Sequence, residues 1–315
     1  MGDDGGSAQV EVRYLVPSLK GQGRASYTAE SRPKVTHACG VTLRNGRRLL
    51  DGVSKGDADD PGTREQLERR GFTMVRGFRS AAHDRLESIE NPLVYRSDKT
   101  VPESVESMAA RDIYFKECED LVQRLTGADV AFHISHAVRN GVGNKLSKDV
   151  EYLTAYATFA HTDYTAEIVP NAWKMLVKRG VPEAQAKRMR VTFMNVWQPT
   201  TVPVEQHPLA LLDWTSVDPD DVVSVTLGYS VTPKAGEGTM QPPIAQLVHN
   251  ERHRWYFFPN MQTDEALVFT QVDGRDEFPR HSFHTAVKHS IKPNPVARQS
   301  VEVRILCGFL DRSAL

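Results

Sequence analysis

The N-terminal part of the chain alternates short apolar runs with polar, turn-rich segments. Residues 9–16 (QVEVRYLV) alternate apolar and polar side chains, which predicts a strand. Residues 20–62 are polar and turn-rich apart from VTHACGV (35–41), and two clusters rich in Gly and Asp, at 45–52 and 54–62, predict loops. A short helical pattern follows, with Thr63 as its expected N-cap and Gly71 just after its end. Residues 72–78 again predict a strand.

A longer helical pattern lies in the middle of the chain. Residues 101–126 place Pro near the start and apolar side chains at helical spacing, and Gly127 ends the pattern. Residues 128–139 alternate well enough to predict a strand. A second helical region covers about 166–190 and is broken in two at 180–182 by Gly and Pro.

After this region the chain consists of short β-branched and aromatic runs separated by Pro, Gly or Asp turns. Such spacing predicts an antiparallel sandwich or barrel, so the expected fold class is α+β, mainly β, with a jelly-roll core and flanking helices. We expect residues 1–8 to be disordered, residues 9–315 to form a single domain, and the β core to cover about 128–310. The runs are VTFMNVWQP, DVVSVTLGY, AQLVHN, RWYFFP, ALVFTQV, HTAVKH and SVEVRILCGF.

The composition limits which partners and which cellular compartment we expect for the protein. Lys+Arg 39 against Asp+Glu 40 leaves a formal net charge of -1, which gives no basic excess for a nucleic-acid backbone. No stretch approaches 18 apolar residues and the N-terminus lacks a signal-peptide pattern, so we expect no membrane contact. Three widely spaced cysteines without a CxxC pair fit a reducing, cytoplasmic location. The expected partner is a small molecule, and the oligomeric state stays open.

Candidate metal ligands begin with the segment HTDYT. On a strand, His161 and Asp163 project from the same face and so enter one cavity. Two imidazoles and one carboxylate form the non-haem Fe(II) site. With 11 histidines in the chain, two His-x-acid pairs are no excess over chance, and context decides between them. His161 follows an apolar approach, whereas His249 and Glu251 lie in a charged run that predicts a solvated loop.

The third ligand is expected from a later strand. His284 begins the strand-like run HTAV, whereas His281 lies in a predicted turn and His289 lies beyond the run. Downstream, Arg298, Ser300, Glu302 and Arg304 alternate with apolar residues and face one side of the next strand. An Arg with a nearby hydroxyl suits a carboxylate of a substrate or cofactor.

Other side chains are weaker candidates for the cavity. Asn195 and Trp197 share a strand face opposite the metal, although an aromatic residue more often fills a core. Arg190 and Tyr256 are candidates to meet a substrate carboxylate, and an Arg is as often part of a structural ion pair. Four more residues are interpreted as structural. They are His133 and His136, expected on opposite faces of a strand, Tyr164, expected to point away from Asp163, and Cys307, expected to be buried.

The order of these motifs resembles the Fe(II)/2-oxoglutarate-dependent oxygenases. The closer resemblance is to the group with gibberellin GA4 desaturase, the AsaB-like hydroxylase/desaturases and the CmcJ-type proteins. That family has a double-stranded β-helix core. The motifs that carry the resemblance, in order along the chain, are HTDYT (161–165), NVWQP (195–199), PLALLDWTSV (208–217), HRWYFFPNMQTDEALVF (253–269), FHTAV (283–287) and RQSVEVR (298–304).

The resemblance implies a set of roles. His161, Asp163 and His284 match the iron ligands, and Arg298 and Ser300 match the residues that bind the distal carboxylate of 2-oxoglutarate. Arg298 lies 14 positions after His284 instead of the usual ten or so, which keeps Arg304 as an alternative. The implied cofactors are Fe(II), 2-oxoglutarate and O2.

The implied reaction is oxidation of an unactivated C–H bond in a small carboxylate- or amino-acid-like metabolite of secondary metabolism. The outcome is hydroxylation, desaturation or oxidative cyclisation such as aziridine formation, with release of succinate and CO2. Two alternatives stay open. One is a same-fold non-haem iron oxidase that does not use 2-oxoglutarate, and the other is a non-catalytic, cupin-like binding protein.

Overall fold

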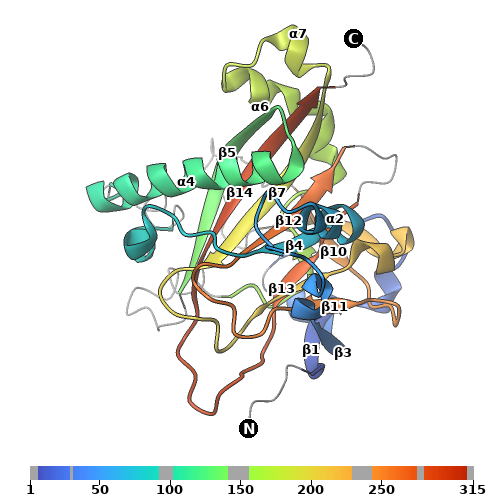
Figure 1. The fold of residues 1–315 in the computed structure, drawn as a ribbon. Coiled ribbons are helices and arrows are strands. Elements are labelled where there is room, and N and C mark those ends of the chain that lie inside the picture. The colour runs from blue at the N-terminus through green and yellow to red at the C-terminus, as the bar shows by residue number, and fades with distance from the viewer. Residues whose placement is uncertain are drawn as a thin grey trace.

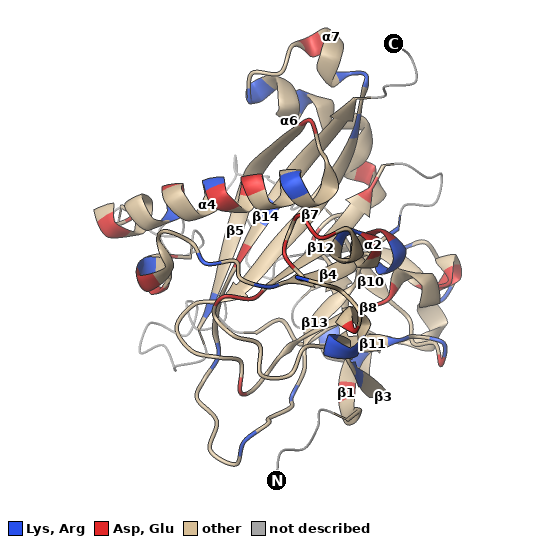
Figure 2. Ribbon diagram, viewed as in Figure 1, with Lys and Arg blue, Asp and Glu red and all other residues tan. Residues whose placement is uncertain are grey.

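The computed structural model is built around two β-sheets that face each other (Figure 1). Acidic and basic residues both occur along the long helix that lies outside the sheets (Figure 2). Among the described residues, no helix is both long and apolar enough to cross a membrane. The structure describes residues 6–28, 31–91, 102–140, 156–228, 243–274 and 280–310.

The smaller sheet has five strands, and each pair of neighbours is antiparallel. Its outer face packs on helix α4 (Val105–Thr126), where Val301, Val303 and Ile305 join the apolar side of the helix in one core cluster. From one edge to the other, the strands are β4 (Phe72–Val75), β12 (Ala266–Asp273), β7 (Met189–Pro199), β14 (Gln299–Leu310) and β5 (Val130–Asn140).

The larger sheet has nine strands and curls on itself. Edge strand β1 also forms bridges from Arg13 to Phe159 and from Leu15 to Val248, beside β6 and β10 in the interior of the sheet. The curl encloses a second apolar cluster that includes Trp255. In sheet order, the strands are β1 (Ala8–Leu15), β3 (Thr36–Asn45), β11 (Trp255–Phe257), β8 (Leu209–Leu212), β13 (His284–Ala286), β6 (His161–Thr162), β10 (Ile244–Leu247), β9 (Val222–Gly228) and β2 (Arg24–Thr28).

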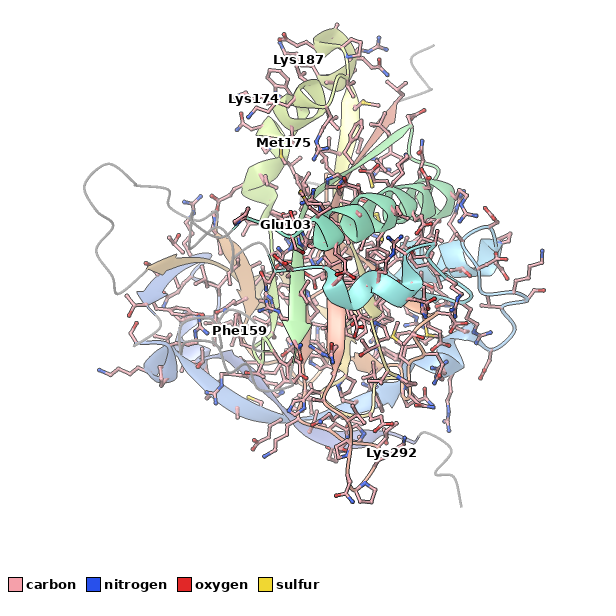
Figure 3. All side chains as sticks on the ribbon, turned by 90° about the vertical axis from the view of Figure 1, so that its left-hand side faces the viewer. Glu103, Phe159, Lys174, Met175, Lys187 and Lys292 are labelled. Atoms are coloured by element: carbon pink, nitrogen blue, oxygen red, sulfur yellow. The ribbon has the colours of Figure 1, made fainter. Side chains whose placement is uncertain are left out.

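The helices lie outside the two sheets. Helices α6 and α7 stand at one end of the molecule, where Lys174 and Lys187 are labelled, whereas Lys292 lies at the opposite end (Figure 3). Besides α4, the helices are α1 (Arg32–Val35), α2 (Pro61–Arg70), α6 (Trp173–Lys178) and α7 (Glu183–Ala186). Single 3₁₀ turns are η1 (Pro17–Leu19), η2 (Gly46–Leu50), η3 (His83–Ser88), η4 (Ala166–Asn171), η5 (Trp214–Ser216) and η6 (Pro219–Asp221).

Capping residues explain where the two principal helices begin and end. Gly71 and Gly127 both adopt the left-handed conformation that ends a helix, as predicted. The predicted N-cap Thr63 is wrong, because Asp60 caps α2 by accepting a hydrogen bond from the Gly62 N–H. With Pro61 at the first helical position, the helix starts three residues upstream of the prediction.

The main predictions of fold are confirmed. The structure is mainly β with a jelly-roll arrangement and flanking helices, and β7 and β9 to β14 follow the predicted runs. Two strands, β2 and β8, did not follow from the pattern. Residues 1–8 were expected to be disordered. Residues 1–5 lie outside the described part of the chain, whereas Ala8 is the first residue of β1. The single domain over 9–315 stays a prediction.

The expectation that His133 and His136 lie on opposite faces of their strand is wrong. Both rings pack against Phe115 of α4, with ring centroids 5.1 and 4.8 Å away. The pairing of β5 with β14 skips one residue between Ser135 and His133, and this bulge reverses the alternation of side chains. Both histidines have structural partners, as interpreted: His133 contacts the Glu119 carboxylate and His136 the main-chain carbonyl of Glu90.

Candidate metal centre

Two histidines and one aspartate meet between the sheets. His161 begins β6 and His284 begins β13, and these residues are paired directly across the two strands. Their ring centroids are therefore only 4.4 Å apart. Asp163 follows β6, and its Oδ1 lies 4.0 Å from Nε2 of His161. One potential ligand atom from each of the three residues lies within 4.8 Å of the others.

The surrounding groups fix the orientation of these side chains. The Nδ1–H of His161 donates to the main-chain carbonyl of Phe159 at 2.9 Å, which leaves Nε2 with its lone pair toward Asp163. The main-chain N–H of Asp163 donates to the side-chain oxygen of Gln271 at 2.8 Å. The side-chain amide of Asn195 donates to Oδ2 of Asp163 at 3.0 Å.

Electrostatics set the protonation of all three groups. Burial lowers the pKa of His161 to about 4, with a further contribution from His284, and burial likewise lowers the pKa of His284 to about 4. Burial alone would raise the pKa of Asp163, but the Arg304 guanidinium together with His284 and His161 outweighs it and holds that pKa well below its usual range. At neutral pH the centre therefore offers two neutral imidazoles and one carboxylate, which are the forms that bind a metal.

Arg298, just before β14, and Arg304, within it, have different contacts. Arg304 donates from Nε and Nη2 to the two carboxylate oxygens of Asp163, each at 2.9 Å, and its Nη2 lies 3.1 Å from Glu302. The guanidinium of Arg298 lies over the rings of Tyr156 and Trp197, at 4.2 and 5.3 Å. It donates one hydrogen bond to the main-chain carbonyl of His207.

Five buried polar atoms near the centre have no hydrogen-bond partner among the described residues. They are Nε of Arg298, Oγ of Ser300, Nδ1 of His284, Oδ1 of Asn195 and Nε2 of Gln271. Arg298 directly precedes β14 and Ser300 is the second residue of that strand, and both side chains are almost fully buried. Because a buried unpaired donor costs about 1–3 kcal/mol, this pair favours an acceptor that binds there.

The cavity at this centre has a volume of about 30 Å³. A space of that size holds an ion or a water molecule. Both sheets contribute to its walls, since His161 and His284 come from the larger sheet and Trp197 from the smaller one. The lining residues are Arg139, Ala157, His161, Asp163, Trp197, Leu209, His284, Ala286, Arg298, Glu302 and Arg304.

The structure separates the four predicted substrate residues into two pairs. Trp197 lines the cavity, and Asn195 contacts Asp163, so both lie at the centre. Arg190 does not line it. Its guanidinium pairs with Asp273 at 2.7 Å and lies over Phe309. Tyr256 belongs to an apolar core cluster and is likewise not among the lining residues.

Three residues at the centre were not predicted as site residues from the sequence. Gln271 lies where the pairing of β12 with β7 is irregular, which removes the alternation that would identify its face. Arg139 reaches the cavity because it pairs across strands with Ser300, and the sequence does not reveal that register. Glu302 lines the cavity, and the alternation of polar and apolar residues along β14 had already placed it on the face of Arg304.

Comparison with known proteins identifies the family. Residues 51–308 match the model of a protein family described as "Oxidoreductase/YMDC permease-like domain". The chain belongs to this oxidoreductase family. Similar characterised members of the wider group are fungal. The chain is 27% identical over 232 residues to the hydroxylase/desaturase efuI of Hormonema carpetanum, covering 68% of this chain and 75% of the relative.

Longer similarities point to the same enzyme class. The chain is 28% identical to the Fe(II)/2-oxoglutarate-dependent dioxygenase nvfI of Aspergillus novofumigatus, over 94% of this chain and 95% of the relative. It is 26% identical to the alpha-ketoglutarate-dependent dioxygenase phiK of a fungal species, over 90% and 94% of the two chains. A solved structure of the iron and alpha-ketoglutarate-dependent endoperoxidase NvfI superposes with a TM-score of 0.70 at 22% identity, covering 97% of this chain and 99% of the other.

The resemblance found in the sequence motifs is thereby confirmed at the level of the family. The predicted enzyme class, a 2-oxoglutarate-dependent non-haem iron dioxygenase, is the class of these relatives, and Fe(II), 2-oxoglutarate and O2 are its cofactors. The NvfI structures support the predicted jelly-roll core. The cytoplasmic location and the lack of a nucleic-acid partner stay predictions.

Proposed function

We propose that this oxidoreductase oxidises an unactivated C–H bond of a small carboxylate- or amino-acid-like metabolite, with Fe(II) held by His161, Asp163 and His284. The observation that carries the proposal is the convergence of these three ligand atoms within 4.8 Å in a buried cavity. Two imidazoles and one carboxylate leave open positions on Fe(II), as oxygen activation requires.

The donor set fits Fe(II) on two further grounds. Both imidazoles are neutral at pH 7, since burial lowers the pKa of each to about 4. The hydrogen bond from His161 to Phe159 orients the ring so that Nε2 is the free donor atom. When bound, Fe(II) with 2-oxoglutarate supplies the O2-dependent oxidising power, and the products are succinate, CO2 and the oxidised metabolite.

Arg298 is the better candidate for the distal carboxylate of 2-oxoglutarate. Its Nε and the neighbouring Oγ of Ser300 are buried and unpaired among the described residues, so a carboxylate between them would satisfy both. Arg304 already donates two hydrogen bonds to Asp163. We therefore assign to Arg304 the role of holding the Asp163 carboxylate ionised and in place.

The longer separation between His284 and Arg298 has a local structural explanation. The connection between β13 and β14 forms a loop that Glu205 holds by accepting a hydrogen bond from the Val296 N–H at 2.9 Å and an ion pair from Lys292. The loop therefore takes up the additional residues. Arg298, the residue before β14, still lines the cavity.

The remaining side chains would position the co-substrate and exclude water. Trp197 and Tyr156 lie against the Arg298 guanidinium, which restricts its movement and shields it from solvent. Asn195 and Arg304 both donate to Oδ2 of Asp163, so this oxygen accepts two hydrogen bonds. Because the cavity is only about 30 Å³, we expect its walls to move apart when the co-substrate enters.

Equilibrium dialysis under anaerobic conditions tests the ligand assignment without knowledge of the substrate. We expect the wild-type chain to bind one Fe(II), and His161→Ala and His284→Ala to bind at least about 100-fold more weakly, because each removes one of three protein ligands. His289→Ala, on the same segment as His284, is the matched control and should bind like the wild type. Wild-type affinity in either ligand variant would contradict the assignment.

A further inference from the structure

A second and much larger cavity lies on the opposite side of the nine-stranded sheet from the metal centre. Its volume is about 590 Å³, against about 30 Å³ at the metal centre, and the two linings share no described residue. His161 pairs with Gln246, whereas Ala245 of the second cavity is the preceding residue of β10, so the two cavities lie on opposite faces.

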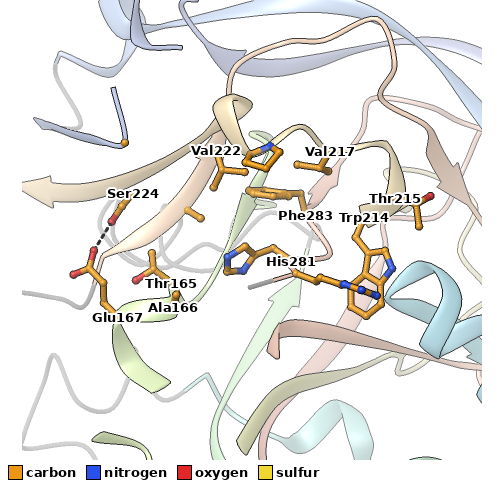
Figure 4. A pocket seen from close by; sticks show the side chains of 14 residues that line it. Thr165, Ala166, Glu167, Trp214, Thr215, Val217, Val222, Ser224, His281 and Phe283 are labelled. Atoms are coloured by element: carbon orange, nitrogen blue, oxygen red, sulfur yellow. Dashed lines mark hydrogen bonds between the residues drawn. The ribbon is translucent and has the colours of Figure 1, made fainter. Parts of the chain in front are cut away.

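The floor and walls of this cavity are apolar. Phe283 and Ala245 are almost fully buried and belong to the core cluster inside the curled sheet, and the half-buried Val217 and Val222 pack against that cluster. Trp214 turns its ring rather than its N–H to the cavity, since that N–H donates to the main-chain carbonyl of Arg69 at 2.9 Å. The cavity therefore opens directly onto the end of a hydrophobic core (Figure 4).

His281 provides a polar atom inside these apolar walls. Figure 4 shows its ring projecting into the cavity between Phe283 and Ala166. The Nδ1–H of His281 donates to the main-chain carbonyl of Gln271 at 2.7 Å, and only 7% of the residue is exposed. The other nitrogen, Nε2, is then an acceptor in the neutral ring. Burial lowers the pKa of His281, so this neutral form prevails at pH 7.

The polar groups at the rim are already paired with one another. Oγ of Ser224 donates to the Glu167 carboxylate at 3.1 Å, and Arg24 lies 3.2 Å from the same carboxylate oxygen. The Arg280 guanidinium lies over the Trp214 ring at 5.5 Å. A ligand that enters therefore meets apolar walls and, deeper inside, the acceptor nitrogen of His281.

We propose that this cavity is a second binding site, which takes a small ring-bearing alcohol or phenol whose hydroxyl donates to Nε2 of His281. A volume of about 590 Å³ lies within the range of small-molecule sites, which is about 300–1,000 Å³. The walls supply apolar contact for the ring system, and the single buried acceptor selects a ligand with a donor. The proposal is independent of the metal centre and of its reaction.

Isothermal titration of the full-length protein with 2-naphthol tests the site. The comparison ligand is 2-methoxynaphthalene, which has the same rings but no hydrogen to donate. We expect 2-naphthol to bind about tenfold more tightly, as one hydrogen bond to a buried acceptor provides. His281→Phe should remove that preference, and Val217→Phe should weaken both ligands by filling the cavity.

His161→Ala serves as the control, because it alters the metal centre and leaves the second cavity intact. It should bind 2-naphthol like the wild type, so a failure of the iron assignment would not affect this result. If His281→Phe does not fold, the Val217→Phe variant still decides the question. Equal affinity for the two ligands in the wild type, or unchanged affinity for both in Val217→Phe, would overturn the proposal.

Discussion

Arg298 lies just before β14 and Arg304 within it, and both line the cavity, yet their surroundings predict different functions. Arg304 donates to both oxygens of Asp163, whereas Nε of Arg298 is buried without a partner among the described residues. Arg304 therefore stabilises the negative charge of the Asp163 carboxylate. Arg298 is suited instead to bind the carboxylate of the incoming co-substrate. The difference is measurable in the kinetics of the two variants.

We expect Arg298→Met to raise KM for 2-oxoglutarate by about 10–100-fold, because it removes charge-assisted hydrogen bonds worth about 1.5–3 kcal/mol. Arg304→Met should instead weaken Fe(II) binding and lower kcat, since it leaves the Asp163 carboxylate buried without its counter-ion. Steady-state 2-oxoglutarate decarboxylation and Fe(II) dialysis separate the two. A rise in KM for 2-oxoglutarate only in the Arg304 variant would reverse the assignment.

His161→Ala and Asp163→Ala should abolish turnover, since each removes one of the three ligand atoms that meet in the cavity. The measurement is Fe(II)-dependent succinate formation from 2-oxoglutarate, with circular dichroism to verify the fold. Full activity in either variant would end the proposal that these residues hold the iron.

At the scale of elements, helix ends and long strands could be predicted from the sequence, whereas short buried strands could not. Strand β8 (LALL) is buried on both faces and so shows no alternation. Strand β6 is only two residues long, and Asp163 lies just beyond it, yet the prediction that His161 and Asp163 share a cavity agrees with their positions. The bulge in β5 reversed the expected faces, because an inserted residue leaves no mark in the pattern.

The two helix-ending glycines provide a matched test of local packing. A Cβ at Gly71 would lie 2.2 Å from Oγ of Ser282 and 2.5 Å from the Trp214 ring, whereas at Gly127 the nearest atom is 3.8 Å away. Both have positive φ, of +87° and +72°. Gly127→Ala should therefore cost only about 1–2 kcal/mol of unfolding free energy for its backbone.

Gly71→Ala should cost clearly more, because the steric overlap adds to the same backbone cost. Urea unfolding of the two variants beside the wild type measures the difference. Equal losses of unfolding free energy would show that Ser282 and Trp214 move aside freely, contrary to the close packing of α2 against η5.

At the scale of the whole molecule, the site depends on pairings that no local pattern reveals. His161 and His284 become neighbours through the pairing of β6 with β13, and Arg304 reaches Asp163 across the space between the sheets. The order of motifs indicated which residues share a function, but neither the curl of the nine-stranded sheet nor the second cavity behind it followed from the sequence.

The buried histidines make the stability of the metal-free protein depend on pH. Burial lowers the pKa of His253 from its usual 6.5 to about 4, and the ring lies among Tyr14, His249 and Asp221. Between pH 6.5 and 4 the unfolded chain therefore binds more protons than the folded chain, so stability is complete above pH 6.5 and declines as pH falls toward 4.

Chemical unfolding of the chelator-treated protein across this range should show that decline. The buried His161 and His284 contribute in the same direction. His253→Gln should therefore make the dependence shallower without abolishing it. A wild-type stability that stays constant or rises between pH 6.5 and 4 would contradict the buried, neutral state of these rings.

The central claim is that His161, Asp163 and His284 hold Fe(II) where 2-oxoglutarate can chelate it, with Arg298 on the distal carboxylate. Anaerobic titration of the Fe(II)-loaded protein with 2-oxoglutarate measures this directly through the visible charge-transfer absorption of the chelate. We predict a band that saturates at one 2-oxoglutarate per chain in the wild type, is absent in His161→Ala, and requires about 10–100-fold more 2-oxoglutarate in Arg298→Met. An iron-loaded wild-type protein that shows no band would contradict the account.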